Sequence, residues 1–286
     1  MAKGTLRQGA QWRAFGLAAP AIVWLVVFFL LPLVFVLGAS VMTRGPTGAP
    51  VMPLTLDQYE RTLTVFSPVL WRTLWFALAS TLLSLLIGYP LAFFISARRS
   101  PTVRTLLLFL VLLPFWTNFL VRTYALITIV QREGVLNTLL VGLGLLQDPV
   151  QMLFTPGAVM LGLVYGYLPF MVLPIYASVE RLDRRFVEAA YDLGANDWRA
   201  FWRVIAPLTM PGVVAGCMLV FIPAIGAFIT PDLMGGTQGL MIGNLVQSQF
   251  RGRGNIPLGS AISMVLLVVV FVGVLIYTRY GERRES

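Results

Sequence analysis

The feature that most constrains the fold of this chain is a series of apolar stretches, each long enough to cross a lipid bilayer. A spanning helix needs about 20 consecutive apolar residues, because the hydrocarbon core is about 30 Å thick. Such stretches cover residues 17–42, 71–96, 105–129, 157–178, 212–232 and 259–279. Only 12% of the 286 residues are charged, against about 25% in soluble domains. The sequence therefore predicts an all-α integral membrane protein with six transmembrane helices in a single domain, residues 1–286.

The first apolar stretch has two interpretations. Lys3, Arg7 and Arg13 precede it, as basic residues precede a signal peptide, and residues 38–40 (Gly-Ala-Ser) weakly resemble a cleavage site. The apolar core of a signal peptide is about 7–15 residues long, however, and this stretch is much longer. We therefore expect a retained first helix that follows a cytoplasmic tail at residues 1–16.

Missing residue types exclude several functions. The chain has no His and a single cysteine, Cys217, which rules out imidazole catalysis, a Cys or His metal cluster and an internal disulfide. Its one lysine, Lys3, belongs to no GxxxxGK[ST] phosphate-binding loop. The sequence thus predicts no enzyme, no catalytic residue, and no metal or cofactor in this chain. The net charge of +9 is spread over short loops, whereas nucleic-acid binding requires a clustered basic face, so no nucleic-acid partner is expected.

The distribution of basic residues predicts the orientation, because cytoplasmic loops carry more Lys and Arg than external ones. With the N-terminus inside, 7 of the 21 basic residues fall on the outer side: Arg44, Arg61, Arg72, Arg122, Arg132, Arg251 and Arg253. The other 14 fall on the inner side: Lys3, Arg7, Arg13, Arg98, Arg99, Arg104, Arg181, Arg184, Arg185, Arg199, Arg203, Arg279, Arg283 and Arg284. Both termini are therefore expected in the cytoplasm. Three longer segments are then expected on the outer side, at residues 43–70, 130–156 and 233–258. Each contains a short piece that is helical or apolar, at residues 54–63, 135–146 and 240–250 respectively.

The cytoplasmic loop at residues 180–210 has the pattern of a helix, a tight turn and a second helix. Apolar residues recur with helical spacing on one face of the first helix: Leu182, Phe186, Ala189, Ala190 and Leu193. Gly194 suits the left-handed turn at a helix C-terminus, and Asn196 can cap a second helix, which Pro207 is expected to end. An aromatic ridge then follows on the second helix, formed by Trp198, Phe201 and Trp202.

Two interpretations of this loop stay open. Buried aromatic residues dominate the energetics of protein interfaces, so the ridge can dock into a groove on a partner protein. Alternatively, Trp198 and Trp202 anchor a helix at the membrane surface, and Glu188 only pairs with Arg184 four residues earlier.

The same loop resembles the EAA motif of ABC-importer permeases. Glu188, Ala189, Ala190, Gly194 and Pro207 match that motif, while Val204 replaces Ile and Ala206 replaces Leu. Further segments resemble the spermidine/putrescine importer permeases, namely residues 113–116, 121–124, 162–171, 231–236 and 242–247. The resemblance extends from about residue 54 to residue 279.

This resemblance implies a type I ABC-importer permease fold in a bacterial inner membrane. It implies two permease chains, often non-identical, around one pore, and two ATPase subunits that hold ATP and Mg²⁺. A periplasmic substrate-binding protein would deliver the solute. The implied ATPase-docking residues are Glu188, Ala189, Ala190, Gly194, Asn196, Trp198, Phe201, Trp202 and Pro207.

Polar and aromatic residues inside the spans are candidates for the substrate path. A cationic substrate favours aromatic faces and acids, which points to Asp232, Trp116, Asn118, Tyr165 and Tyr167. The alternative is that the aromatic residues mark the membrane interface and that Asp232 only anchors a loop. Arg122 is unfavourable beside a path for cations, so we expect it near the outer interface, either paired with an acid or closing the periplasmic gate.

One departure bears on the substrate. Many polyamine permeases carry a carboxylate in the fifth span where this chain has Ala227. Polyamines remain the first expectation, with opine-like or amino-acid-derived solutes and metal-anion complexes as alternatives. A secondary transporter, an embedded enzyme or a scaffold are further alternatives. Secondary transporters bury acidic residues at the membrane midplane, and these spans contain almost none.

Overall fold

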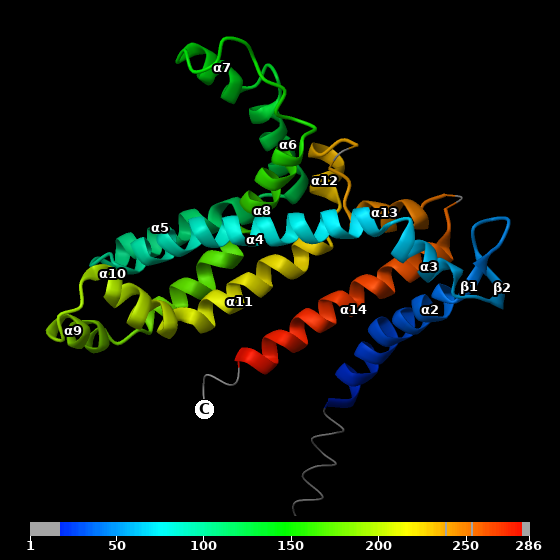
Figure 1. Cartoon of the computed structure of the whole chain (residues 1–286), viewed down its shortest axis with the longest axis horizontal. Helices are drawn as coiled ribbons and strands as arrows, with labels where there is room; N and C mark the ends of the chain where they lie inside the picture. The colour runs from blue at the N-terminus through cyan, green and yellow to red at the C-terminus, as the bar shows by residue number, and fades with distance from the viewer. Residues whose placement is uncertain (1–17, 238, 253, 282–286) are drawn as a thin grey trace, which may run out of the picture. The chain divides into compact units, whose positions relative to one another are not determined.

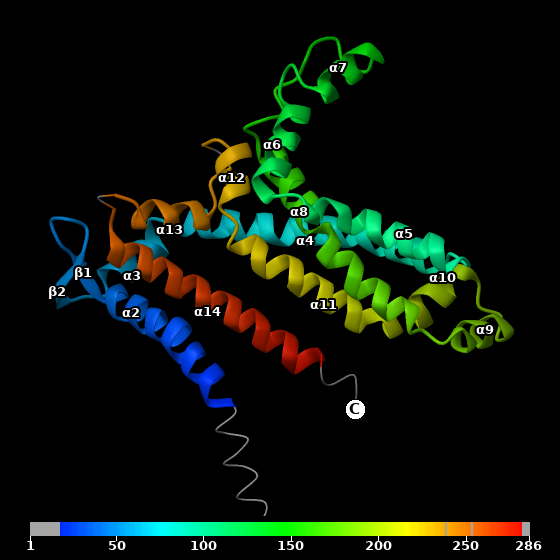
Figure 2. The same ribbon diagram turned by 180° about the vertical axis from the view of Figure 1, so that it is seen from behind.

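The computed structural model describes residues 18–237, 239–252 and 254–281. Several residues used for the topology prediction lie outside this part, as does the expected tail at 1–16: Lys3, Arg7, Arg13, Arg253, Arg283 and Arg284. The chain forms two compact units, one of Met1–Val65 with Ser248–Val268 and one of Phe66–Gln247 with Val269–Ser286. Figures 1 and 2 show the elements from two sides.

The described residues contain five helices that are long and apolar enough to span a membrane, and the six expected spans if one bent pair counts as a span. Five single helices qualify: Ala18–Ser40, Ser67–Ser96, Pro156–Glu180, Asp197–Ile225 and Ile256–Leu275. The sixth is a bent pair, Pro101–Trp116 with Phe119–Gly142. The fold is therefore that of a multi-pass helical membrane protein, as the apolar pattern predicts.

The third expected span, residues 105–129, is broken in the structure. It consists of α5 (Pro101–Leu112), the 3-10 helix η2 (Leu113–Trp116) and α6 (Phe119–Val130), and the two halves meet at 96°. Pro114 lies in η2, and proline weakens a helix because it has no N–H to donate. Asn118 then starts α6 by accepting a hydrogen bond from the Leu120 amide at 2.8 Å. The break therefore has local causes that the apolar pattern alone does not reveal.

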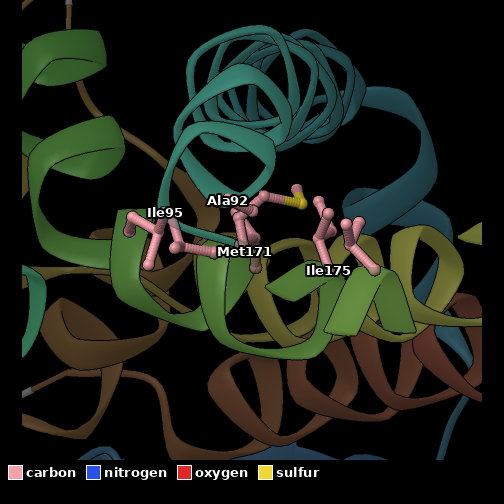
Figure 3. Packing of buried hydrophobic residues seen from close by; sticks show 7 residues of the cluster. Ala92, Ile95, Met171 and Ile175 are labelled. Carbon is pink, nitrogen blue, oxygen red and sulfur yellow. The ribbon is translucent and has the colours of Figure 1, made fainter. Parts of the chain in front are cut away.

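The core of the larger unit lies where α4 (Ser67–Ser96), α8 (Pro156–Glu180) and α11 (Ala206–Ile225) pack against each other (Figures 1 and 2). Figure 3 shows Ala92 and Ile95 of α4 beside Met171 and Ile175 of α8. All four side chains are fully buried within this chain. These three helices form the frame on which the candidate sites are built.

Two glycines on α11 allow its close approach to α8. A Cβ on Gly212 would lie 2.5 Å from the Pro174 carbonyl oxygen, and one on Gly216 would lie 2.9 Å from the Met171 sulfur. Small residues four apart are a common device for packing helices in membranes. The sequence analysis did not identify this pair, although the GxxxG spacing is present.

Short helices of the larger unit include α7 (Val135–Gly142), α12 (Ile229–Met234) and most of α13 (Ile242–Phe250). Buried polar groups attach α13 to α4 and to the residue that precedes α12. The Ile242 backbone amide donates to the Thr73 hydroxyl at 2.8 Å, and the Asn244 side-chain amide donates to the Phe228 carbonyl at 2.7 Å. Helices are thus present at the short apolar pieces expected near 135–146 and 240–250.

The smaller unit contains the π-helical turn η1 (Val26–Leu30), α2 (Leu31–Ser40), α3 (Asp57–Thr64) and the first part of α14 (Ile256–Gly281). It also contains an antiparallel hairpin of β1 (Met42–Arg44) and β2 (Pro50–Leu54), which the sequence analysis treated as loop. The Ser40 and Tyr59 hydroxyls hydrogen-bond at 2.7 Å, and the Ile256 amide donates to the Gly48 carbonyl at 3.0 Å. These contacts join the hairpin and α3 to the helices of the same unit.

Candidate functional site

The 180–210 segment folds as a helix, a tight turn and a second helix. The first helix is α9 (Arg184–Asp192), and the second begins as α10 (Asp197–Ala200) and the π-helical turn η3 (Phe201–Ile205). Both lie at the end of the larger unit that is opposite α12 (Figures 1 and 2). The segment therefore occupies one end of the helical frame.

The turn between these helices depends on Gly194, which has a φ of 81°. Its amide donates to the Tyr191 carbonyl at 2.9 Å, and the Ala195 amide donates to the Ala190 carbonyl at 3.0 Å. This pair of bonds is the Schellman pattern, which satisfies the free carbonyls at a helix C-terminus. The left-handed turn expected at Gly194 is confirmed.

Side-chain caps fix where both helices begin. The Asp183 carboxylate accepts from the Arg185 amide at 3.0 Å, and the Asn196 side chain accepts from the Arg199 amide at 2.9 Å. An N-cap of this kind stabilises a helix by about 1 kcal/mol. The Asn196 cap was predicted, whereas the Asp183 cap was overlooked.

Asp197 acts on the Tyr191 hydroxyl across the turn. The pKa of the Tyr191 hydroxyl is raised by desolvation and then by the negative charge and hydrogen bond of Asp197. An ionised phenol would be repelled by that carboxylate and would lose its donor proton. The hydroxyl therefore stays a hydrogen-bond donor near neutral pH.

The prediction that Pro207 ends the second helix is wrong. The helix continues without interruption from Asp197 to Ile225 and enters the membrane span directly. Pro207 lies in the first turn of α11, immediately after η3. In η3 the Ala206 amide bonds to the Phe201 carbonyl five residues back, and this wider turn admits a proline without a break.

Two of the three residues of the expected aromatic ridge are largely exposed. Trp198 and Trp202 are 69% and 55% exposed, with their rings edge to face at 5.6 Å. Phe201 instead packs edge to face on Tyr89 of α4, also at 5.6 Å. The Tyr89 hydroxyl hydrogen-bonds to Thr209 of α11 at 2.8 Å. Phe201 therefore joins the segment to the helical frame, and its partly buried ring also packs edge to face on Trp202 at 5.3 Å.

The apolar face predicted for α9 is left largely uncovered by this chain. Phe186 is 57% exposed and Leu193 is 90% exposed. Glu188 and Ala189 are also exposed, and Ala190 is partly buried. The side chain of Arg184, the proposed ion-pair partner of Glu188, is outside the part that the structure describes. The face thus offers apolar area beside the two exposed tryptophans.

An ion pair that the sequence analysis missed lies where the segment leaves α8. Arg104 of α5 pairs with Glu180, the last residue of α8. Its guanidinium also donates to the carbonyls of Ser96 at 3.3 Å and Arg98 at 3.1 Å, at the end of α4. Arg104 thereby connects the ends of three helices. No local pattern in the sequence reveals a pair that is separated by 76 positions.

The predicted substrate-path residues lie on different elements. Trp116 is 79% exposed and contacts Phe109 edge to face. The Tyr167 hydroxyl donates to the Pro223 carbonyl at 3.3 Å. Asp232 is exposed in the first turn of α12.

The remaining two path residues have defined local roles. Asn118 is the N-cap of α6. Tyr165 is partly exposed and forms part of a cavity wall. Within the described ranges, no hydrogen bond or ring contact joins any two of the five path residues.

The cavity lies between α4, α5 and α8 and measures about 280 Å³. Its walls are almost wholly apolar and are formed by Leu91, Ile95, Leu107, Leu110, Val111, Pro114, Tyr165, Leu168 and Pro169. Ala227, where many polyamine permeases carry a carboxylate, is not among the residues that line this cavity. It lies in the break between α11 and α12.

Arg122 has aromatic neighbours in place of the expected acid. Its guanidinium carbon lies 5.2 Å from the Phe115 ring, 5.4 Å from Phe119 and 6.0 Å from Tyr165. It also donates to the Pro114 carbonyl at 3.2 Å. Among the side chains that the structure describes, no acid pairs with it.

Known proteins with similar sequences point to one family. The family described as binding-protein-dependent transport system inner membrane component matches residues 84–285. The spermidine/putrescine transport system permease protein PotB of Haemophilus influenzae is 45% identical over 260 residues, which are 91% of each chain. PotB of Escherichia coli K12 is 46% identical over 257 residues, 90% of this chain and 93% of the relative.

Solved structures show the same fold at lower identity. One chain of a bacterial ABC transporter involved in the import of alginate has a TM-score of 0.71 and 20% identity, covering 96% of both chains. A chain of the MetNI methionine ABC transporter has a TM-score of 0.59 and 16% identity, covering 79% of this chain and 98% of that one. The resemblance inferred from the sequence is confirmed. This chain belongs to the family of inner membrane components of binding-protein-dependent transport systems, as a multi-pass permease subunit of an ABC importer.

Proposed function

We propose that this chain is the permease subunit of an importer that carries polyamines such as spermidine and putrescine across the inner membrane. The observation that supports this most strongly is the identity of 45% and 46% with two PotB permeases over about nine tenths of the chain. ATP hydrolysis, with its Mg²⁺, resides on two ATPase subunits. A second permease chain, non-identical in sequence, completes the pore, and a periplasmic binding protein delivers the substrate.

The 180–210 segment is the ATPase-docking site in this proposal. Leu193, Phe186 and the two exposed tryptophans present apolar area that the described chain does not cover. Buried apolar and aromatic anchors of this kind provide most of the binding energy at protein interfaces. Glu188, Ala189, Ala190, Gly194 and Asn196 supply the helix and turn that hold these anchors.

The helix that runs unbroken from Asp197 to Ile225 supports a direct mechanical role. Movement of the ATPase against Trp198 and Trp202 would displace the membrane span to which they are covalently joined. Phe201 on Tyr89 and the Arg104–Glu180 pair would carry the same displacement to α4, α5 and α8. The spans would then alternate between inward-open and outward-open states.

The proposed topology has both termini and the 180–210 segment in the cytoplasm. Residues 43–70, 130–156 and 233–258 are periplasmic. The position of α9 and α10 at the opposite end of the frame from α12 supports opposite sides of the membrane for the 180–210 segment and α12 (Figure 1). The substrate path would include Trp116, Asn118, Tyr165, Tyr167 and Asp232.

The experiment that tests this function is uptake of labelled spermidine and putrescine by the reconstituted complex. The complex contains this chain, its second permease, the ATPase and the binding protein. ATP-dependent accumulation supports the proposal, and accumulation without ATP would refute the ABC mechanism. Stimulated ATP hydrolysis without polyamine uptake would refute the substrate and favour another small solute, with the missing acid at Ala227 as the physical reason.

A further inference from the structure

We propose that Phe115, Phe119 and Tyr165 form a binding site for an alkylammonium group of the substrate, and that Arg122 occupies this site as a tethered cation until substrate displaces it. We call the three rings the aromatic cluster. The inference rests on the proposed function, because it takes the substrate to be a cationic amine. It assigns Arg122 a role in substrate entry that goes beyond closing a gate.

The geometry around Arg122 is that of a cation bound by aromatic faces. The three ring centroids lie 5.2, 5.4 and 6.0 Å from the guanidinium carbon. Cations are attracted to aromatic rings within about 6 Å of the centroid. The Pro114 carbonyl, 3.2 Å from a guanidinium nitrogen, provides a hydrogen-bond acceptor at the same place. Three rings and a carbonyl are ligands that a substrate ammonium can use equally well.

The nature of these ligands makes Arg122 displaceable. In the described part of the chain the guanidinium forms no ion pair, since Arg104 and Glu180 form the one that is present. Removing one partner of a buried ion pair leaves an uncompensated charge and costs several kcal/mol. Rings and a carbonyl leave no such charge behind. An incoming cation can therefore exchange with Arg122 at a small net cost.

The adjoining cavity accounts for the rest of an alkylammonium ligand. Tyr165 belongs both to the aromatic cluster and to the cavity wall. Pro114, whose carbonyl accepts from Arg122, also lines the cavity. The cavity volume of about 280 Å³ is close to the lower limit for small-molecule pockets. Its apolar walls suit methylene groups, whereas a sugar or an anion would leave its polar groups unpaired there. A cation at the rings with a chain of methylenes in the cavity fits both parts.

The site spans the break in the third membrane segment. Phe115 lies in η2 before the break, Phe119 and Arg122 lie in α6 after it, and Tyr165 lies in α8. A change in the 96° bend would therefore move Arg122 relative to Phe115. Exchange of Arg122 for substrate is thus linked to the shape of this segment.

Equilibrium binding of labelled spermidine to the complete transporter without its binding protein tests the inference. Arg122→Gln removes the tethered cation, and we expect spermidine to bind about fivefold to thirtyfold more tightly, the equivalent of about 1–2 kcal/mol. Arg122→Lys keeps a competing cation and should give a smaller change. Arg132→Gln, at an exposed arginine in the next loop, is the matched control and should bind as the wild type does.

A second pair of variants tests the rings. Combined with Arg122→Gln, Tyr165→Phe keeps the aromatic face and should retain the tighter binding, whereas Tyr165→Leu should lose it. Thermal unfolding of each complex identifies a variant that fails to fold. If Arg122→Gln fails to fold, the spermidine affinity of Arg122→Lys is compared with that of the wild type instead. Unchanged or weaker binding by folded Arg122→Gln or Arg122→Lys overturns the inference.

The same preparation separates this inference from the proposed function. If the wild-type complex takes up spermidine but Arg122→Gln shows no gain in spermidine binding, the proposed function stands and the inference about Arg122 is refuted. Wild-type complex that neither binds nor takes up polyamines overturns both.

Discussion

Substitution of Gly194 tests the turn on which the 180–210 segment depends. Its φ of 81° lies in the left-handed region, where a residue with a Cβ incurs about 1–2 kcal/mol. A Cβ at this position would meet no atom within 4 Å. The free-energy cost of a substitution therefore comes from the backbone conformation and not from a steric clash. The two hydrogen bonds of the turn contribute roughly 1–3 kcal/mol together, which is comparable to that cost.

Gly194→Leu should therefore reduce the population of the turn by about fivefold to thirtyfold. Asparagine enters the left-handed region more readily than other residues with a Cβ, so Gly194→Asn should lie close to the wild type. The expected order of coupling is Gly, then Asn, then Ala, then Leu. Membrane insertion should be unaffected, because the turn lies outside the apolar core of the spans.

The assay compares ATP hydrolysis stimulated by the loaded binding protein with substrate uptake in proteoliposomes. Gly142→Leu is the matched control, since a Cβ there also meets no atom within 4 Å and its φ is not positive. Full stimulation and uptake by Gly194→Leu would refute the role of the turn. A defect in Gly194→Asn as large as that of Gly194→Leu would show that side-chain size at a partner surface, rather than φ, is what matters.

Three further predictions concern packing and docking. Gly212→Ala should lower the stability of the complex by about 1–3 kcal/mol, seen as a lower thermal midpoint, because the new Cβ would lie 2.5 Å from the Pro174 carbonyl; an unchanged midpoint would contradict the close helix contact. Leu193→Glu should weaken ATPase association at least tenfold in a pull-down titration without altering permease yield, since Leu193 is 90% exposed; wild-type association would exclude this face. Glu180→Gln should lower the stability of the complex by less than about 1 kcal/mol, seen as a nearly unchanged thermal midpoint, because its pair with Arg104 is partly solvated. A large loss of stability would show that the pair is buried in the assembly.

Local chemistry made the turn and caps of the 180–210 segment predictable. Gly194 is at the end of an amphipathic pattern, and Asn196 follows two residues later. A left-handed turn and an N-cap depend on residues within five positions of one another. The structure confirms both the turn and the cap.

Other features of the same segment depend on more than local chemistry. The orientation of Phe201 depends on Tyr89, more than a hundred positions earlier in the chain. Spacing alone groups Phe201 with the two tryptophans, because all three lie within one helical turn. Pro207 likewise suggests a helix end by its own chemistry, and only the π turn before it allows the helix to continue.

The sequence by itself determined that this is a helical membrane protein with six spans, because each span must bury its own backbone polar groups in lipid and so needs a long apolar run. It also determined the local turn at Gly194. Tertiary structure alone decided that Gly212 packs on Pro174, that Arg104 reaches Glu180, and that Arg122 lies among aromatic rings instead of beside an acid. Apolar runs in a bilayer are interchangeable in composition, so their sequence does not specify which faces meet. Shape and small residues on neighbouring helices make that choice.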